Sequence, residues 1–558
     1  MSYGPRALHR KPRRTPRWPL FAAVLLLLSA ALFVPSFLYE EKAPPSRPRL
    51  IYRGARQGYP VVVEAGEAYV PFGFVRKAID PDAFWDESGV VVVTTRDKVV
   101  KLKTNSLTAY VNRHPVDLRL PVTLEGGEPY IPAGALEMLY PVATSLCADA
   151  SAFVVRRTDV ETAVARTASD TVVRLEPGIL SRRAGVLRAG SEVRVYDTSG
   201  GWAAVEAEDG LAGWLPVKRL TGQALRPGEV KPPEDYVPPP LMGRKLCLVW
   251  EQVDVRTPDP SGIGAMDGLN VVSPTWFRLG EKPGEVENYV DARYVAWAHS
   301  KGYKVWALFS NSFELQRTRT VLRDSDLRDK VMSQILVYAG MYSLDGINID
   351  FEDVYQDDGP YLTQFVREMT PFLHEMGLAV SIDVTVRSES PTWSLCYERK
   401  RLSEVVDYVM LMGYDQYGAG SRVAGPNASI PWTKSAIETT LEEVPAGKLV
   451  LGIPFYTRLW KETAGGGEVK VTQKALGMDQ AREWLRSEGV SAAYDPETGL
   501  QYAERTKGQD TYRIWLEDES SVRQRMDLAR SYGLAGIAAW RRGFEDPAIW
   551  GVVAGFSR

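Results

Sequence analysis

The chain has 558 residues, of which 45% are apolar, so it is too long for one ordinary domain and apolar enough to bury several separate cores. Its 67 Lys and Arg residues nearly balance its 70 Asp and Glu residues, which argues against nucleic acid or another strongly charged partner. Three cysteines and four histidines are scattered at long spacing, so neither a disulfide framework nor a zinc cluster is expected, and we predict no metal and no cofactor.

The N-terminal segment has the pattern of a membrane anchor. Six basic side chains stand within residues 1–17, and an uncharged apolar run extends from Trp18 to Tyr39. A bilayer core of roughly 30 Å is crossed by about 20 helical residues, and a basic flank stays in the cytoplasm. We therefore predict a cytoplasmic tail at 1–17, a transmembrane helix at 18–39 and an extracellular remainder on the cell membrane. The alternative is secretion after signal-peptide cleavage, which the bulky end of the run disfavours.

A β-rich domain is predicted at residues 50–157, after a proline-containing linker at 40–49. Its short apolar runs alternate with turns, and the run Glu67-Ala-Tyr-Val-Pro71-Phe72 is echoed by Glu128-Pro-Tyr-Ile-Pro132. This pattern resembles the N-terminal stalk domain of copper amine oxidases. The resemblance implies a spacer or a wall-contacting module, without copper chemistry.

A second small β domain is predicted at residues 165–222. Glycines punctuate its strands at short intervals, as a small barrel requires, and two of them precede Trp202 and Trp214. The order resembles bacterial SH3-like domains, which implies binding of cell-wall peptides, although both tryptophans can equally serve core packing. A proline-rich linker follows at 223–243, and its composition favours an extended, semi-rigid chain.

The last domain is predicted at residues 244–558. Eight buried, β-branched-rich segments recur there, most of them separated by helical patterns, and they start near Leu246, Leu269, Lys304, Gly346, Leu378, Tyr408, Leu449 and Gly536. Apolar strands that alternate with amphipathic helices indicate a parallel α/β (TIM) barrel. The oversized gap after Phe455 predicts an inserted α+β lobe, with a strand at Thr511 to Leu516 and a helix at Ser520 to Tyr532.

The segment from Asp345 to Glu352 carries the chemistry. Strand alternation sends its apolar residues to the helices and sends Asn348, Asp350 and Glu352 into the barrel, with Glu352 at the carboxyl-terminal rim. Burial and mutual repulsion raise the proton affinity of the outermost acid, so Glu352 suits a general acid. Two carboxylates on one strand, about 6.6 Å apart, approach a sugar from the same side. They cannot flank the scissile bond as an ordinary pair does, so another group must attack the anomeric carbon, and an acetamido oxygen of the substrate would suffice.

The domain resembles glycoside hydrolase family 18, the chitinase-like family, whose signature is D-G-x-D-x-D-x-E. The chain supplies Asp345, Gly346, Asp350 and Glu352, with Asn348 where aspartate is commonest, and further matches stand at Met412-Gly-Tyr414-Asp415, at Gly452 to Tyr456 with Arg458, and at Trp540. The run Asn-Ile-Asp-Phe-Glu and Trp276 on the second strand narrow the resemblance to the spore cortical-fragment lytic branch.

The resemblance assigns roles to these residues. Glu352 is the proton donor, Asp350 orients the acetamido group as it closes to an oxazolinium ion, and Tyr414 and Asp415 hold that group. Trp540 forms an apolar floor under the sugar. A second set is expected to contact or support the substrate, with core packing as the alternative for the tryptophans: Asp345, Asn348, Met412, Arg458, Trp250 and Trp276.

These patterns predict hydrolysis of β-1,4 bonds at N-acetylglucosamine in peptidoglycan or its fragments, with retention and substrate assistance. A chitinase with the same machinery is one alternative. A non-catalytic glycan receptor on the same barrel is another, and the inward Glu352, which a receptor does not need, disfavours it.

Overall fold

The computed structural model describes residues 47–95, 98–147, 150–228, 245–465 and 468–557. These residues form two compact units: the first consists of residues up to 81, 104–107 and 117–234, and the second of 82–103, 108–116 and 235–558. The predicted tail and transmembrane helix at 1–39 lie outside the described ranges. Within those ranges no helix is long and apolar enough to span a bilayer.

The first unit begins with two four-stranded sheets whose strands come from both ends of the predicted β-rich domain. One sheet has the order β12 (Val142–Leu146), β13 (Ala152–Arg157), β1 (Arg49–Tyr52) and β2 (Ala55–Pro60). The other has the order β10 (Thr123–Glu125), β11 (Glu128–Pro132), β4 (Glu67–Pro71) and β3 (Val62–Glu64). Three short helices accompany them: α2 (Phe72–Phe74), η1 (Val75–Ile79) and α3 (Ala133–Leu139).

The two echoed sequence runs lie side by side as β4 and β11, which pair antiparallel. Glu67 accepts a hydrogen bond of 2.9 Å from the backbone N–H of Gly134 at the start of α3. Glu128 does the same, at 2.7 Å, for Gly73 in α2. Each glutamate therefore accepts from a backbone N–H at the start of the helix that follows the other run, where such donors have no partner within the helix. This explains why both runs begin with a glutamate and end with a proline before a helix.

The predicted SH3-like segment forms a seven-stranded antiparallel sheet. Its order is β16 (Arg183–Leu187), β15 (Thr171–Arg174), β19 (Ala212–Pro216), β18 (Trp202–Ala207), β17 (Glu192–Ser199), β14 (Thr162–Thr167) and β20 (Leu220–Arg226), with the turn η2 (Val217–Arg219). Val173, Val193, Val205 and Leu215 form its core. The two tryptophans are half-buried, and the SH3-like resemblance stays a prediction.

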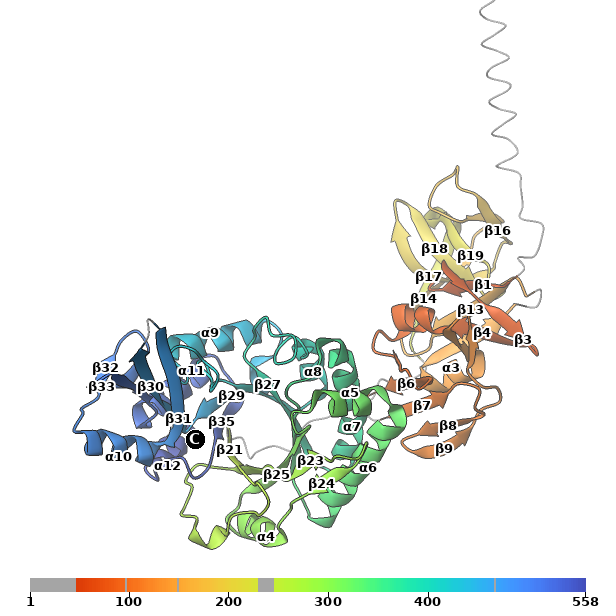
Figure 1. Cartoon of the computed structure of the whole chain (residues 1–558). Coiled ribbons are helices and arrows are strands. Elements are labelled where there is room, and N and C mark those ends of the chain that lie inside the picture. Colours follow the sequence, from red (N-terminus) through yellow and green to blue (C-terminus); the bar gives the residue numbers. More distant parts are fainter. Residues whose placement is uncertain (1–46, 96–97, 148–149, 229–244, 466–467, 558) are drawn as a thin grey trace, which may run out of the picture. The chain divides into compact units, whose positions relative to one another are not determined.

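The second unit contains the predicted barrel. Eight parallel strands follow one another as β21 (Leu246–Glu251), β22 (Val271–Pro274), β25 (Lys304–Ser310), β26 (Gly346–Asp350), β27 (Ala379–Thr385), β28 (Tyr408–Met412), β29 (Leu449–Pro454) and β35 (Gly536–Trp540). The pairing of the last strand, β35, with the first, β21, closes the ring, which Figure 1 shows surrounded by helices. The eight predicted strands are confirmed, each within two residues of its predicted start.

Helices cover the outside of the ring: α4 (Ala292–Ser300), α5 (Leu315–Arg323), α6 (Ser325–Met341), α7 (Gly359–Glu375), α8 (Arg399–Val405), α9 (Ile430–Leu441), α11 (Glu519–Ser531) and α12 (Ile549–Ser557). A hairpin of β23 (Phe277–Leu279) and β24 (Val286–Asn288) extends the sheet beside β25. The short turns η3 (Pro260–Gly262), η4 (Gln356–Asp358) and η5 (Ala446–Lys448) complete the connections.

The insertion after β29 is a five-stranded sheet with one helix. Its strands are β30 (Tyr456–Gly465), β31 (Glu468–Gly477), β32 (Ala493–Asp495), β33 (Leu500–Lys507) and β34 (Asp510–Leu516), and its helix is α10 (Met478–Glu488). The prediction that the helix at 520–532 belongs to this lobe is wrong. That helix is α11, which contacts β29, β35, α9 and α12. Its buried Val522, Met526 and Ala529 join the core of the barrel.

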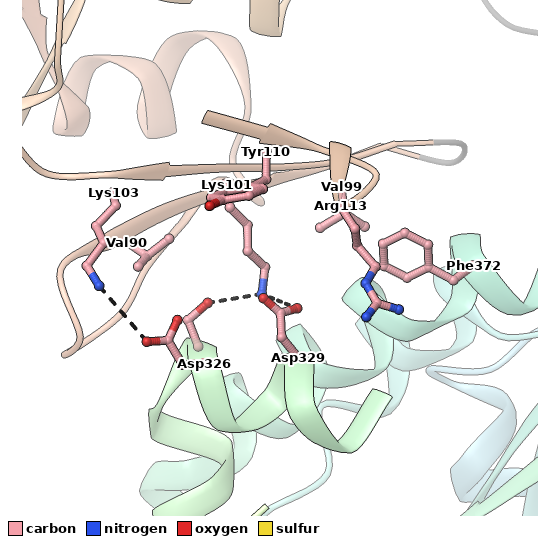
Figure 2. A pocket seen from close by; sticks show the side chains of 10 residues that line it. Val90, Val99, Lys101, Lys103, Tyr110, Arg113, Asp326, Asp329 and Phe372 are labelled. Atoms are coloured by element: carbon pink, nitrogen blue, oxygen red, sulfur yellow. Dashed lines mark hydrogen bonds and ion pairs between the residues drawn. The ribbon is translucent and has the colours of Figure 1, made fainter. Parts of the chain in front are cut away.

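A small antiparallel sheet from the N-terminal half also belongs to the barrel unit. It contains β5 (Phe84–Trp85), β6 (Val90–Thr94), β7 (Val99–Lys103), β8 (Thr108–Val111) and β9 (His114–Asp117). Within the predicted domain at 50–157, residues 82–103 and 108–116 group with the barrel unit. Val90, Val92 and Val99 pack against Phe372 of α7, next to a cavity of about 300 Å³ (Figure 2).

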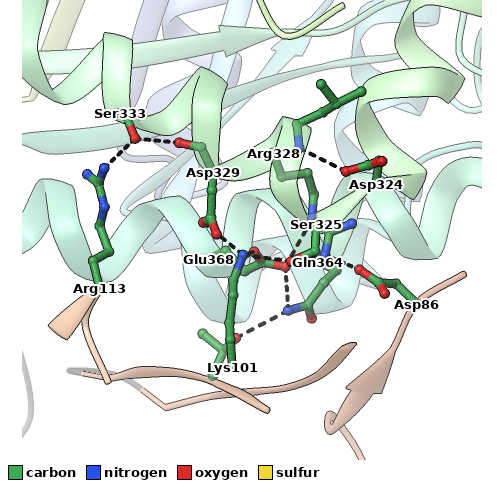
Figure 3. A network of polar contacts seen from close by, with 12 residues as sticks. Asp86, Lys101, Arg113, Asp324, Ser325, Arg328, Asp329, Ser333, Gln364 and Glu368 are labelled. Carbon is green, nitrogen blue, oxygen red and sulfur yellow. Dashed lines mark hydrogen bonds and ion pairs between the residues drawn. The ribbon is translucent and has the colours of Figure 1, made fainter. Parts of the chain in front are cut away.

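Buried charges join this sheet to the barrel helices (Figure 3). The Arg328 guanidinium of α6 is fully buried and lies 3.0 Å from Asp86 and 3.0 Å from Glu368 of α7. Lys101 of β7 contacts Glu368 at 2.7 Å and Asp329 at 2.8 Å. Burial raises the pKa of Glu368, but Arg328 and Lys101 outweigh burial and hold that pKa below its ordinary value. The network therefore needs both partners, because an unpaired buried charge is costly.

Candidate active site

Strand β26 presents its polar residues to the barrel interior. Ile347, Ile349 and Phe351 are buried in the core between strands and helices, so the residues that alternate with them point inward. Glu352 lies two residues after the last residue of the strand, and Asn311 holds its backbone by two hydrogen bonds. The Glu352 N–H donates to Asn311 Oδ1 at 3.1 Å, and Asn311 Nδ2 donates to the Glu352 carbonyl at 2.6 Å.

A cavity of about 670 Å³ lies at the carboxyl ends of the barrel strands. Its volume suits a small-molecule or sugar site. Seven of the predicted site residues line it: Trp250, Asp350, Glu352, Met412, Tyr414, Asp415 and Trp540. They come from the first, fourth, sixth and eighth barrel strands, and residues far apart in the chain thereby meet around one space.

The two acids of β26 are set up to hold protons. Burial raises the pKa of Asp350 to about 7. Burial, and then repulsion by Asp350, Asp415 and Asp353, raises the pKa of Glu352 well above its ordinary value. Asp350 Oδ1 is buried and accepts no hydrogen bond within the described part of the chain. The raised pKa favours the protonated form of Glu352, which is the form that a general acid needs.

Asp415 is held in a strained, well-anchored position after β28. Its φ of 62° lies in the left-handed region, which is unfavourable for a residue other than glycine. Its N–H donates to Asn427 Oδ1 at 3.1 Å, and its Oδ1 accepts from the Tyr456 hydroxyl at 2.6 Å and from Arg458 at 2.5 Å. These contacts orient the carboxylate toward the cavity and occupy one of its oxygens.

Aromatic rings form one side of the cavity. Trp250 lies 6.1 Å from Trp540 and 6.5 Å from Tyr414, measured between ring centroids. Burial raises the pKa of Tyr414 well above its ordinary value, with Asp383 as the next cause, so its hydroxyl remains a hydrogen-bond donor. Apolar ring faces next to a hydroxyl donor match a sugar that carries an amide group.

Four predicted binding residues do not line the cavity. Asp345 precedes β26 at the opposite end, where it accepts from Lys304 Nζ at 2.7 Å and from the Val305 N–H at 2.9 Å. Asn348 is fully buried below the cavity floor. Arg458 is nearly buried and positions Asp415. Trp276 is fully buried, with Nε1 donating to Thr257 Oγ1 at 2.8 Å, so the core alternative describes it.

The structure adds residues that the sequence reasoning missed. Asp383 of β27 lines the cavity, is 1% exposed and accepts a 2.7 Å hydrogen bond from Asn348 Nδ2. The alternation of Ser381 and Asp383 with apolar neighbours was the available signal. A charged group at the β23–β24 side was also missed: Asp254, Arg278, Glu281, Glu287 and Arg317.

Comparison with known proteins agrees with this geometry. Residues 278–545 match the family described as glycosyl hydrolases family 18, and residues 57–140 match the copper amine oxidase N-terminal domain. Relatives include the uncharacterized glycosylase YvbX of Bacillus subtilis (strain 168), 24% identical over 50% of this chain and 83% of that protein. The cortical fragment-lytic enzyme of the same organism is 26% identical over 44% of this chain and 57% of its own length.

Among solved structures, the spore cortex-lytic enzyme SleL of Bacillus megaterium QM B1551 shares the fold, with a TM-score of 0.50 and 18% identity. The alignment covers 66% of this chain and 89% of that one. The chain spans just over half the length of the cortical fragment-lytic enzyme that it matches. The predicted family resemblances are confirmed for both of these domains: the chain contains a family 18 glycosyl hydrolase domain at residues 278–545, preceded by a copper amine oxidase N-terminal domain at residues 57–140.

Proposed function

We propose that this protein hydrolyses β-1,4 glycosidic bonds at N-acetylglucosamine in peptidoglycan or its fragments, with retention and assistance by the substrate. One observation carries the proposal: Asp350 at the end of β26 and Glu352 two residues later both line a sugar-sized cavity, and Asp350 Oδ1 has no hydrogen-bond partner among the described residues. The acids nearest to them are engaged, Asp415 by Tyr456 and Arg458, and Asp383 by Asn348. Glu352 can therefore supply a proton, whereas the hydrogen bonds to Asp415 and Asp383 leave neither of these two carboxylates free to act as the nucleophile.

The expected reaction has two steps. In the first, Glu352 gives its proton to the leaving glycosidic oxygen while the acetamido oxygen of the substrate forms a bond to the anomeric carbon. The resulting oxazolinium ion is positively charged, and the carboxylate of Asp350 stabilises it. In the second step, water attacks the anomeric carbon, the bond to the acetamido oxygen breaks, and the Glu352 carboxylate takes back a proton from the water.

The charged side of the cavity favours peptidoglycan over chitin. Arg278 and Arg317 line this side together with acidic residues, and Arg317 also donates to the Leu279 carbonyl at 2.9 Å. Peptidoglycan carries carboxylates and peptides on alternate sugars, whereas chitin is neutral. Only peptidoglycan therefore offers charged groups that can pair with the charged side chains of the cavity. The relative named as a cortical fragment-lytic enzyme points the same way.

The decisive experiment incubates a chain of residues 47–558 with purified peptidoglycan and, separately, with chitin oligomers. Mass spectrometry of the new reducing ends should show N-acetylglucosamine released from peptidoglycan, and the first-formed anomer seen by NMR should be the retained one. Preferential cleavage of chitin supports the chitinase alternative. Binding without cleavage, unchanged by Glu352→Gln, supports the receptor. Turnover of a substrate without the N-acetyl group contradicts the assisted mechanism.

We also propose that the protein is anchored in the cell membrane by residues 18–39 and reaches the wall with its first unit. The seven-stranded sheet then binds cell-wall peptides. Fractionation of cells that express the full chain should place it in the membrane pellet, whereas a chain starting at residue 47 should be soluble. Recovery of the full chain in the medium after cleavage supports secretion instead.

A further inference from the structure

The barrel interior contains a third buried acid next to the pair on β26. Strands β26 and β27 are parallel, and their register pairs Asn348 with Ser381 and Ile349 with Ile382. The next residue of each strand is Asp350 and Asp383, so these two side chains stand side by side on neighbouring strands. Neighbouring strands are about 4.8 Å apart, a separation at which two like charges repel strongly.

Asn348 is oriented so that its amide donates to Asp383. Its Oδ1 accepts hydrogen bonds from Trp250 Nε1 at 2.7 Å and from Ser273 Oγ at 3.3 Å. Because the oxygen is held by these donors, the amide nitrogen must face the other way, and it donates to Asp383 Oδ1 at 2.7 Å. An asparagine flipped the other way would set its nitrogen against the indole N–H. The amide therefore favours the ionised form of Asp383 and leaves Asp350 unpartnered.

The groups that face Asp383 are few. Asp350 and Glu352 act on it from β26, Asn348 donates to it, and Tyr414 lies near it after β28. Among the described residues, no lysine or arginine pairs with Asp383, whereas Asp415 has Arg458. With no cation beside Asp383, the three acids share protons, and a negative charge on any one of them raises the proton affinity of the other two. Burial, then Asp350 and Glu352, raises the pKa of Asp383 itself well above its ordinary value, as expected for acids that share protons.

We propose that Asp383 is an electrostatic positioning residue of this active site: its carboxylate, held by Asn348 beside Asp350, keeps the catalytic proton on Glu352. The inference rests on the proposed function, because it concerns the proton that Glu352 gives to the leaving oxygen. Asp383 does not touch the reacting atoms. Its charge acts through the two acids of β26, and removing that charge lowers the proton affinity of both.

The test is a charge exchange between the two strands, read from the pH dependence of kcat/KM on peptidoglycan fragments. In Asp383→Asn, both limbs of the profile should move to lower pH by about one unit, the size expected when one nearby charge is removed from a buried acid. In Asn348→Asp, the added carboxylate should move both limbs up. The double variant Asn348→Asp/Asp383→Asn restores the charge and reverses the hydrogen bond. Its limbs should return to those of the wild type.

Ser381→Ala is the matched control, since Ser381 points into the barrel from the same strand, is fully buried and lies one layer below. It should leave both limbs in place. The inference is overturned if Asp383→Asn lowers the rate but leaves both limbs of its pH profile at the wild-type positions. It is also overturned if the double variant folds but keeps the pH profile of Asp383→Asn. If Asp383→Asn does not fold, a pH profile of Asn348→Asp that is the same as that of the wild type overturns the inference. A wild-type chain that cleaves no glycan instead contradicts the proposed function.

Discussion

Glu352 combines a raised pKa with a fixed backbone, and these properties make its substitution informative. Glu352→Gln keeps the shape and removes the proton donor, so kcat should fall by about 10²- to 10⁴-fold, the usual contribution of a general acid. The release of reducing ends measures this fall. A midpoint of thermal unfolding at or above that of the wild type shows that the fold is intact. A variant that keeps more than about a tenth of the activity is incompatible with Glu352 as the acid.

Asp350 makes stability depend on pH. Its pKa is about 7 in the folded protein, above its ordinary value. Between those two values the folded state binds a proton that the unfolded state releases, so this contribution to stability is present at low pH and is lost as pH rises toward 7. Asp350→Asn removes the titrating group and therefore this loss of stability at high pH. It should be more stable than the wild type at pH 8, by up to about 4 kcal/mol, and equal to it near pH 3.5.

Denaturant unfolding at the two pH values measures this difference. The control is Asp326→Asn, which alters a carboxylate whose side chain is 80% exposed and should show no change between the two values. If the stability difference between Asp350→Asn and the wild type is no larger at pH 8 than at pH 3.5, the raised pKa of Asp350 is contradicted.

The sequence identified the inward-facing residues of β26 because the alternation of side chains along one strand can be recognised without knowing which strands lie beside it. It could not tell that Trp276 and Arg458 are covered by other elements, since burial depends on the whole fold. Asp383 was missed for a related reason. Its importance comes from the register between β26 and β27, which no single strand reveals.

At the scale of elements, Lys101 is one of the buried charges that join the β5–β9 sheet to α6 and α7. Lys101→Met removes the cation that lies 2.7 Å from the fully buried Glu368. The barrel unit should lose about 3 kcal/mol of unfolding free energy, as expected when a buried ion pair loses one partner. Lys103→Met is the matched control on the same strand. Its pair with Asp326 is exposed and 4.0 Å long, so the change should be under about 0.5 kcal/mol.

Denaturant unfolding followed by tryptophan fluorescence compares these two variants. Equal losses in both would mean that the buried network does not hold the sheet. The eight barrel strands were predictable because their apolar runs are long and regularly spaced. The neighbours of an element were not predictable: the helix α11 was recognised but assigned to the inserted lobe, because periodicity identifies an element and not what it packs against.

For the whole molecule, the barrel unit is assembled from three separate stretches of chain. A chain of residues 245–558 lacks β5 to β9 and exposes Phe372 and the buried Glu368. It should unfold at a temperature at least several degrees lower than a chain of residues 47–558, or accumulate as aggregates. A chain without residues 162–226, which removes the seven-stranded sheet and keeps β5 to β9, is the control. Its barrel should unfold at the temperature of the longer chain, and an equally stable 245–558 fragment contradicts the expectation.

The long separation between Asp86 and Arg328, 242 positions along the chain, also governs the order of assembly. During synthesis the β5–β9 sheet leaves the ribosome well before α6 and α7 exist, so its buried charges and its valines have no partner for that interval. Contacts of such sequence separation form late and slow the folding of the barrel. The region that anchors the catalytic unit is therefore also the one most exposed to aggregation or chaperone binding while the chain is being made.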